Sequence, residues 1–128
     1  MKKPHEVWFE YAEDDLKFAH VGLREGFYSK VCFLSQQVIE KVLKGCLVQQ
    51  GKPYPKTHKL VDLYSLCNLK WLKPYKEKIK LIDEFYIPSR YPEGIPGDLS
   101  TRPSNENDAK EAISAAKEIL HLALLKIR

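Results

Sequence analysis

Four polar residues interrupt an apolar stretch of the sequence at helical spacing: Gln37, Glu40, Lys41 and Lys44. Positions i, i+3, i+4 and i+7 of an α-helix share one face, so these side chains form a stripe. Lysines bind phosphates and a glutamine can hydrogen-bond a base or a sugar, which predicts a nucleotide or RNA contact. The alternative, which composition alone favours, is a solvated face with an intrahelical Glu40–Lys44 pair.

The run Thr57-His58-Lys59 is a second candidate for chemistry. Histidine side chains change charge near neutral pH, so His58 could act as a general acid or base. Thr57 is a good N-cap for a short helix, and a helix N-terminus attracts anions. The alternative is that these residues only cap that helix.

A third candidate is Arg90, which stands beside Tyr91 between Pro88 and Pro92. An arginine next to an aromatic ring in a proline-bounded turn predicts a contact to a phosphate or a base. Arg102 is a weaker version of the same idea. The alternative is a rigid loop whose Tyr91 packs on the rest of the protein.

Carboxylates offer a fourth candidate at Glu13, Asp14 and Asp15. Two of them could help to hold a magnesium-bound nucleotide, although composition favours a plain charged helix face. The four histidines have no partner at metal-ligand spacing, and glycine-rich phosphate loops are absent from the sequence. We therefore expect neither a metal site nor a cofactor.

Hydrophobic periodicity predicts the helices that position these residues. A first helix should run from near Pro4 to Gly26 and a second from near Ser29 to Gly51, the second so apolar that it should be central. A short helix after Thr57, a fourth from about Pro74 to Tyr86 and a last one from Ser104 or Asn105 should follow. The proline-rich stretch 87–103 reads as a loop. The sequence predicts an all-α, up-and-down bundle of four to five helices in one domain, 1–128.

Composition limits the classes of function. The chain has 128 residues and a formal net charge of +4, which permits an acidic partner without requiring one. The three cysteines read as buried thiols. Because no apolar run is long enough for a membrane span, we expect a cytoplasmic protein with no membrane partner. The apolar second helix, two tryptophans and seven tyrosines predict a homodimer.

Several segments, in order along the chain, resemble the HEPN family, named for nucleotide binding in higher eukaryotes and prokaryotes, in its stand-alone prokaryotic form. The opening helix is similar around Ala12-Glu13-Asp14-Asp15-Leu16, and the second helix resembles the family at Tyr28–Phe33 and through Gln36-Gln37-Val38-Ile39-Glu40-Lys41-Val42-Leu43-Lys44. Thr57-His58-Lys59-Leu60 and Ser89-Arg90-Tyr91-Pro92 resemble its next two landmarks.

The resemblance implies a helical bundle that dimerises and acts in toxin–antitoxin systems, either as a metal-independent ribonuclease or beside a small nucleotidyltransferase partner. Ribonuclease members carry an arginine, four to six residues and then a histidine, a pattern that none of the four arginines here satisfies. We therefore expect a binding module for a nucleotide, RNA or the nucleotidyltransferase rather than an enzyme. A ribonuclease with a non-standard Arg90/His58 pair and a purely structural adaptor stay open as alternatives.

Overall fold

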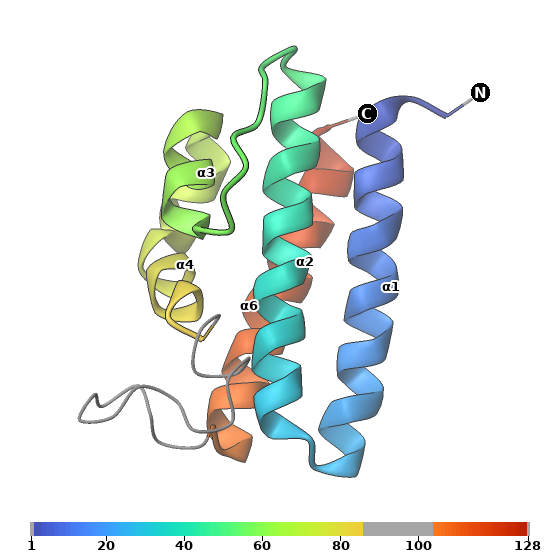
Figure 1. Ribbon diagram of the computed structural model, residues 1–128, viewed down its shortest axis with the longest axis vertical. Helices are drawn as coiled ribbons and strands as arrows, with labels where there is room; N and C mark the ends of the chain where they lie inside the picture. The colour runs from blue at the N-terminus through green and yellow to red at the C-terminus, as the bar shows by residue number, and fades with distance from the viewer. Residues whose placement is uncertain (1, 86–103, 128) are drawn as a thin grey trace.

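Three long helices form the body of the protein, and shorter helices cover one side of it (Figure 1). The structure, a computed structural model, describes residues 2–85 and 104–127. The long helices are α1 (Pro4–Glu25), α2 (Tyr28–Gln49) and α6 (Glu106–Lys126). The short ones are α3 (Leu60–Cys67), the 3-10 helix η1 (Lys70–Tyr75) and α4 (Lys76–Asp83). The predicted all-α, up-and-down bundle is confirmed.

The α1–α2 hairpin begins and ends at the predicted residues. Pro4 stands in the first turn of α1, and Gly26 ends it in the left-handed conformation at φ 83°. The two helices approach closely at Gly45 of α2. A Cβ atom there would lie 2.7 Å from Cε1 of Phe9, so only glycine fits without displacing that ring. This close contact places α1 directly beside the polar stripe of α2.

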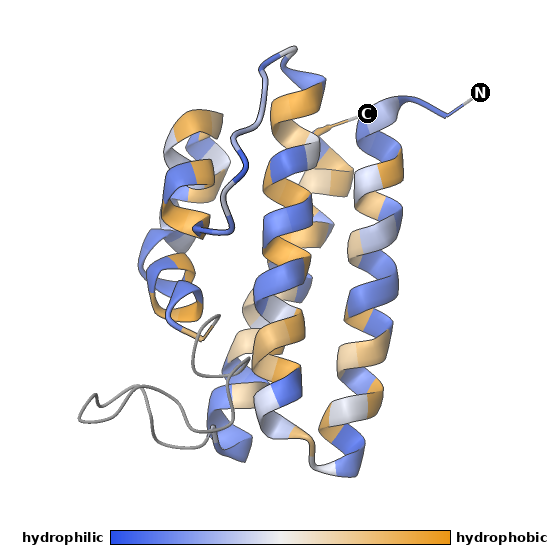
Figure 2. Ribbon diagram, in the orientation of Figure 1, coloured by the Kyte–Doolittle hydropathy of each residue, from blue (hydrophilic) through white to orange (hydrophobic). Residues whose placement is uncertain are grey.

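Helix α2 is the centre of the bundle, as predicted, and contacts α1, α3, α4 and α6. Hydrophilic bands nevertheless interrupt its apolar surface (Figure 2). Helix α6 packs against α2 and α1 through small side chains, because Ala109, Ala112, Ala116 and Ala123 are all buried. Asn105 starts α6 with a capping box that it forms with Asp108.

The start of α3 differs from the prediction. Thr57 is not its N-cap: the helix begins three residues later at Leu60, and the Thr57 hydroxyl accepts the amide of Lys59 instead. Asp83, at the end of α4, supplies the cap. Its Oδ1 accepts the amide of Leu60 at 2.8 Å and its Oδ2 that of Val61 at 3.3 Å. The N-terminal amides of α3 therefore bond to a carboxylate 22 and 23 residues away.

The predicted fourth helix is shorter than expected. Pro74 lies inside η1 rather than at the start of α4, which begins at Lys76 and ends at Asp83. The predicted end at Tyr86 and the predicted loop 87–103 lie outside the described residues. Within residues 2–85 and 104–127, none of the helices is long and apolar enough to cross a membrane.

Candidate functional site

The polar stripe of α2 is organised around the carboxylate of Glu40, which is only 5% exposed. Three side chains donate hydrogen bonds to it: Lys44 Nζ at 3.0 Å, His58 Nδ1 at 3.1 Å and Gln37 Nε2 at 3.4 Å. A buried carboxylate needs such partners, because without them its desolvation is costly. Glu40 therefore fixes the positions of the surrounding polar groups.

His58 reaches this carboxylate because the segment after α2 turns back along that helix (Figure 1). The amide of Gln36, a fully buried side chain, donates to the backbone carbonyl of His58 at 2.8 Å. The neighbouring Gln37 donates to the Gln36 side chain in turn, at 2.6 Å. The backbone and the ring of His58 are thus both held by α2, while its side chain stays 56% exposed.

Two aromatic rings lie near the ammonium of Lys44, in addition to its partner Glu40. Its ammonium lies 5.9 Å from the centroid of Trp8 and 5.7 Å from that of Tyr54. The two rings meet edge to face at 5.4 Å. Aromatic faces attract cations, so these rings replace part of the water that a buried ammonium loses.

Lys41 pairs with Asp15 of α1, and both side chains are about three-quarters buried. The stripe therefore carries two lysines against two carboxylates, Glu40 and Asp15, and these four charges balance. A phosphate that binds here must share or displace a carboxylate partner. The alternative of a solvated face is wrong for Glu40 and Lys44, which are buried, although the Glu40–Lys44 pair that it includes is present.

The arrangement is suited to proton transfer or to anion recognition at His58. A buried carboxylate that accepts the Nδ1 proton of a histidine fixes the tautomer and orientation of the ring, as in catalytic triads. Because His58 remains half-exposed, its ring can meet a ligand at the surface. Lys41, with a side chain 25% exposed, is the neighbouring cation at the edge of the stripe.

The structure brings together five of the eight predicted site residues: Gln37, Glu40, Lys41, Lys44 and His58. Lys59 is exposed and stands at the N-cap of α3, one residue beyond this cluster. Arg90 and Tyr91 lie outside the described residues, as does Arg102.

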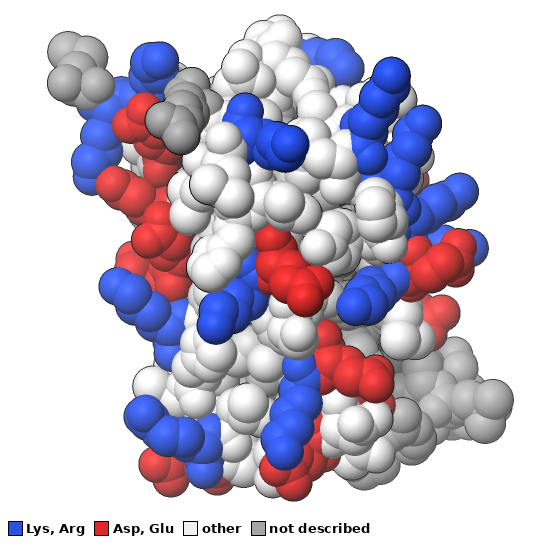
Figure 3. Space-filling view, turned by 180° about the vertical axis from the view of Figure 1, so that it is seen from behind, with Lys and Arg blue, Asp and Glu red and all other residues white. Residues whose placement is uncertain are grey.

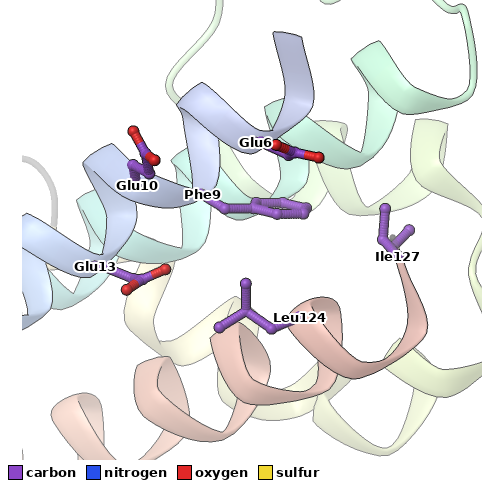
Figure 4. A pocket seen from close by; sticks show the side chains of 6 residues that line it. All are labelled: Glu6, Phe9, Glu10, Glu13, Leu124 and Ile127. Atoms are coloured by element: carbon purple, nitrogen blue, oxygen red, sulfur yellow. The ribbon is translucent and has the colours of Figure 1, made fainter. Parts of the chain in front are cut away.

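The acidic run of α1 does not form one site. Asp15 faces α2 and bonds to Lys41, whereas Glu13 faces α6. Glu13 lines a separate hollow of about 330 Å³ with Glu6 and Glu10, above a floor of Phe9, Leu124 and Ile127 (Figure 4). Among the described candidate residues, Glu13 alone lines that hollow, and those of the polar stripe and of the segment Thr57–Lys59 do not.

Sequence reasoning missed the roles of Trp8, Tyr54 and Asp15 around the two lysines. Trp8 and Tyr54 read as ordinary packing residues, and Asp15 as part of a charged run. Trp8 and Asp15 lie seven residues apart and so share one side of α1. That spacing does not indicate which helix this side of α1 faces. Nothing local pairs either of them with α2.

Comparison with known proteins assigns the class of this bundle. A family model for the HEPN domain matches residues 5–127, so the chain belongs to the HEPN family. The crystal structure of TT1696 from Thermus thermophilus is similar, with a TM-score of 0.83 and 31% identity over 98% of this chain and 100% of that one. The crystal structure of ST0689, described as an archaeal HEPN homologue, gives a TM-score of 0.78 and 34% identity over 99% and 100%.

A further relative comes from Methanocaldococcus jannaschii and is named "Putative toxin MJ1304". It is 27% identical over 127 residues, which cover 91% of this chain and 83% of the relative. The predicted family membership is confirmed by the family model.

Proposed function

We propose that this HEPN protein binds a nucleotide or RNA at the surface formed by Gln37, Glu40, Lys41, Lys44 and His58, within a toxin–antitoxin type system. The observation that carries the proposal is the half-exposed His58 ring, which the buried Glu40 carboxylate holds in one orientation. With Nδ1–H bonded to Glu40, the His58 ring turns Nε2 to the ligand: as the imidazolium it donates to a phosphate, and Lys41, on the same polar stripe of α2, supplies a second cation. The name of the Methanocaldococcus relative supports the toxin context.

Calorimetric titration with ATP, GTP and a short single-stranded RNA tests this proposal. We expect binding to at least one of them, and an affinity about tenfold weaker for His58→Ala, since a lost charged hydrogen bond costs on the order of 1.4 kcal/mol or more. Lys41→Ala should reduce the slope of log affinity against log salt for RNA by about one. His121→Ala, which alters an exposed histidine of α6, is the matched control and should bind as the wild type does.

Absence of binding by folded wild-type protein to all three ligands would contradict the proposal. Equal affinities for the His58→Ala and His121→Ala variants would place the ligand elsewhere on the protein.

The same His58–Glu40 pair favours a second candidate function, a ribonuclease in which His58 transfers protons and Arg90 stabilises the negative charge on the phosphorane oxygens. RNA cleavage by purified protein in EDTA tests it. Activity that disappears in His58→Ala and Arg90→Ala but survives in His121→Ala supports the enzyme. Cleavage that persists in all three variants indicates a contaminating nuclease.

Docking of a small nucleotidyltransferase is the part of the proposal that rests on the family resemblance. It predicts that this chain co-purifies with a nucleotidyltransferase encoded beside it. If the nucleotidyltransferase docks outside the polar stripe, Lys41→Glu should leave that complex intact while it weakens RNA binding. Loss of both in Lys41→Glu would contradict separate surfaces.

A further inference from the structure

The hollow between α1 and α6, called the acidic hollow below, joins an apolar floor to a negatively charged rim. The floor consists of Phe9, Leu124 and Ile127, and the rim of Glu6, Glu10 and Glu13 (Figure 4). Seen from behind, red side chains line the upper part of the edge formed by α1 (Figure 3). The acidic hollow is independent of the proposed ligand site, because none of the residues around His58 lines it.

The negative charge of this rim is local and largely unpaired. Residues 4–16 contain five carboxylates and no lysine or arginine, in a chain whose formal net charge is +4. Glu6 and Glu13 are half-buried, and neither makes an ion pair or a side-chain hydrogen bond within residues 2–85 and 104–127. A partly desolvated carboxylate without a partner is unfavourable, so the rim favours a cation from outside the fold.

An ammonium of the chain itself already binds to this rim. Lys2 Nζ lies 2.5 Å from Oε1 of Glu10. The hydrogen bond and the charge of Glu10, with a smaller contribution from Glu6, raise the pKa of the Lys2 amino group. The rim therefore stabilises a protonated amine, and Lys2 pairs with only one of its three carboxylates.

A second polar group without a partner adjoins the floor. The ring of His5 meets that of Phe9 edge to face at 5.8 Å. The His5 side chain is 5% exposed, and its Nε2 has no hydrogen-bond partner within the described residues. A donor bound beside Phe9 can supply the hydrogen bond that this buried nitrogen lacks.

We propose that the acidic hollow binds a linear polyamine, with the ammonium groups at the carboxylates and the methylene chain on the apolar floor. Glu6, Glu10 and Glu13 are four and three residues apart, so they are separated by about 6 and 4.5 Å along the axis of α1. Ammonium groups joined by four and three methylenes lie about 6 and 5 Å apart in an extended chain with ordinary bond lengths. A triamine with these linkers, such as spermidine, can therefore place one ammonium at each carboxylate.

The dimensions of the hollow favour a polyamine over a metal ion or a single basic side chain. A volume of about 330 Å³ holds about ten heavy atoms at roughly 30 Å³ each, which is the size of spermidine. A metal ion needs ligands that converge on one point, whereas these carboxylates are spread along about two turns of helix. The described residues contain no cluster that could hold a metal ion. A single ammonium would leave two of the three carboxylates without a partner.

Calorimetric titration of the whole protein with spermidine at low salt tests this proposal. We expect saturable binding of one molecule. Butylamine, which carries one ammonium on a similar methylene chain, should bind at least about tenfold more weakly, because it can engage only one carboxylate at a time.

The double variant Glu6→Gln with Glu13→Gln should bind spermidine at least about tenfold more weakly, since two of the three charge pairs are lost. Its matched control is Glu77→Gln with Glu84→Gln, which removes two exposed glutamates at the same spacing on and just after α4. The control should bind as the wild type does. Leu124→Gln, which places a polar group in the floor, should weaken binding at least about threefold.

Circular dichroism should show the same helix content in all of these variants. Absence of saturable heat with spermidine, or equal weakening by the two pairs of glutamate substitutions, would overturn the proposal. Equal affinities for spermidine and butylamine would overturn it as well and would identify a single lysine side chain as the better occupant.

Discussion

At the scale of single residues, Glu40 accounts for most of the organisation of the site. It accepts hydrogen bonds from a lysine, a histidine and a glutamine, and its burial makes each of these bonds matter more than it would at the surface. An ion pair of this kind is costly to break from one side, because the remaining charge stays buried.

The Glu40–Lys44 pair can be compared with an exposed pair of the same geometry. Glu106 and Lys110 are also four residues apart and bond at 3.0 Å, but their side chains are 56% and 61% exposed. We expect a double-mutant cycle with Glu40→Gln and Lys44→Met to give a coupling energy above about 1 kcal/mol in urea unfolding. The cycle with Glu106→Gln and Lys110→Met should give less than about 0.5 kcal/mol. Equal couplings would show that burial does not strengthen the pair.

The cysteines give a prediction with a pH dependence. Burial raises the pKa of Cys67 to about 12, against a weaker opposing effect of Lys52, and burial also raises the pKa of Cys46, with a smaller contribution from Cys67. Because the thiolate is the reactive form, both thiols should resist a disulfide reagent at about pH 8 until urea unfolds the chain.

Because these pKa values are raised in the folded protein, its stability should fall as the pH rises. The unfolded chain releases these protons near the ordinary pKa of 9.0, well before the folded one does. The contribution of the buried thiols to the free energy of unfolding is therefore complete below pH 9.0 and falls as the pH rises toward 12. Rapid labelling of Cys46 or Cys67 in the folded protein would contradict this account.

At the scale of the elements, the N-caps of α3 and α6 show which helix starts local sequence rules can predict and which they cannot. The cap of α6 is local, with Asn105 and Asp108 three residues apart, and the sequence predicted the start of this helix to within one residue, at Ser104 or Asn105. The cap of α3 comes from Asp83 through a tertiary contact. Thr57 satisfied the local rule and was still wrong, because a distant carboxylate provides a stronger acceptor than a nearby hydroxyl.

The cap of α3 can be tested directly. Asp83→Ala should lower the free energy of unfolding by about 1 kcal/mol, since it removes the acceptor for two helix-terminal amides. Amide hydrogen exchange of Leu60 and Val61 should accelerate with it. Thr57→Ala is the comparison and should have the smaller effect on both measurements. A larger effect from Thr57→Ala would restore it as the cap.

At the scale of the whole molecule, the sequence was sufficient to predict the bundle but only part of the site. The periodicity of α1, α2 and α6 and the stripe on α2 are properties of single helices. The contacts that complete the site join residues far apart in the chain: Lys41 with Asp15 across 26 positions and Glu40 with His58 across 18. Such pairs depend on how helices and the segment 51–59 pack, which periodicity does not encode.

The central claim is that a nucleotide or RNA ligand binds at His58, beside the polar stripe of α2. The most direct measurement follows the ring resonances of the four histidines in proton–carbon NMR spectra while short single-stranded RNA is added to the whole protein. The account predicts a saturable shift for His58, with His20 of α1 and His121 of α6 unchanged because neither belongs to the proposed surface. Saturable shifts of His20 or His121 with an unmoved His58, or no shift in any histidine, would contradict it.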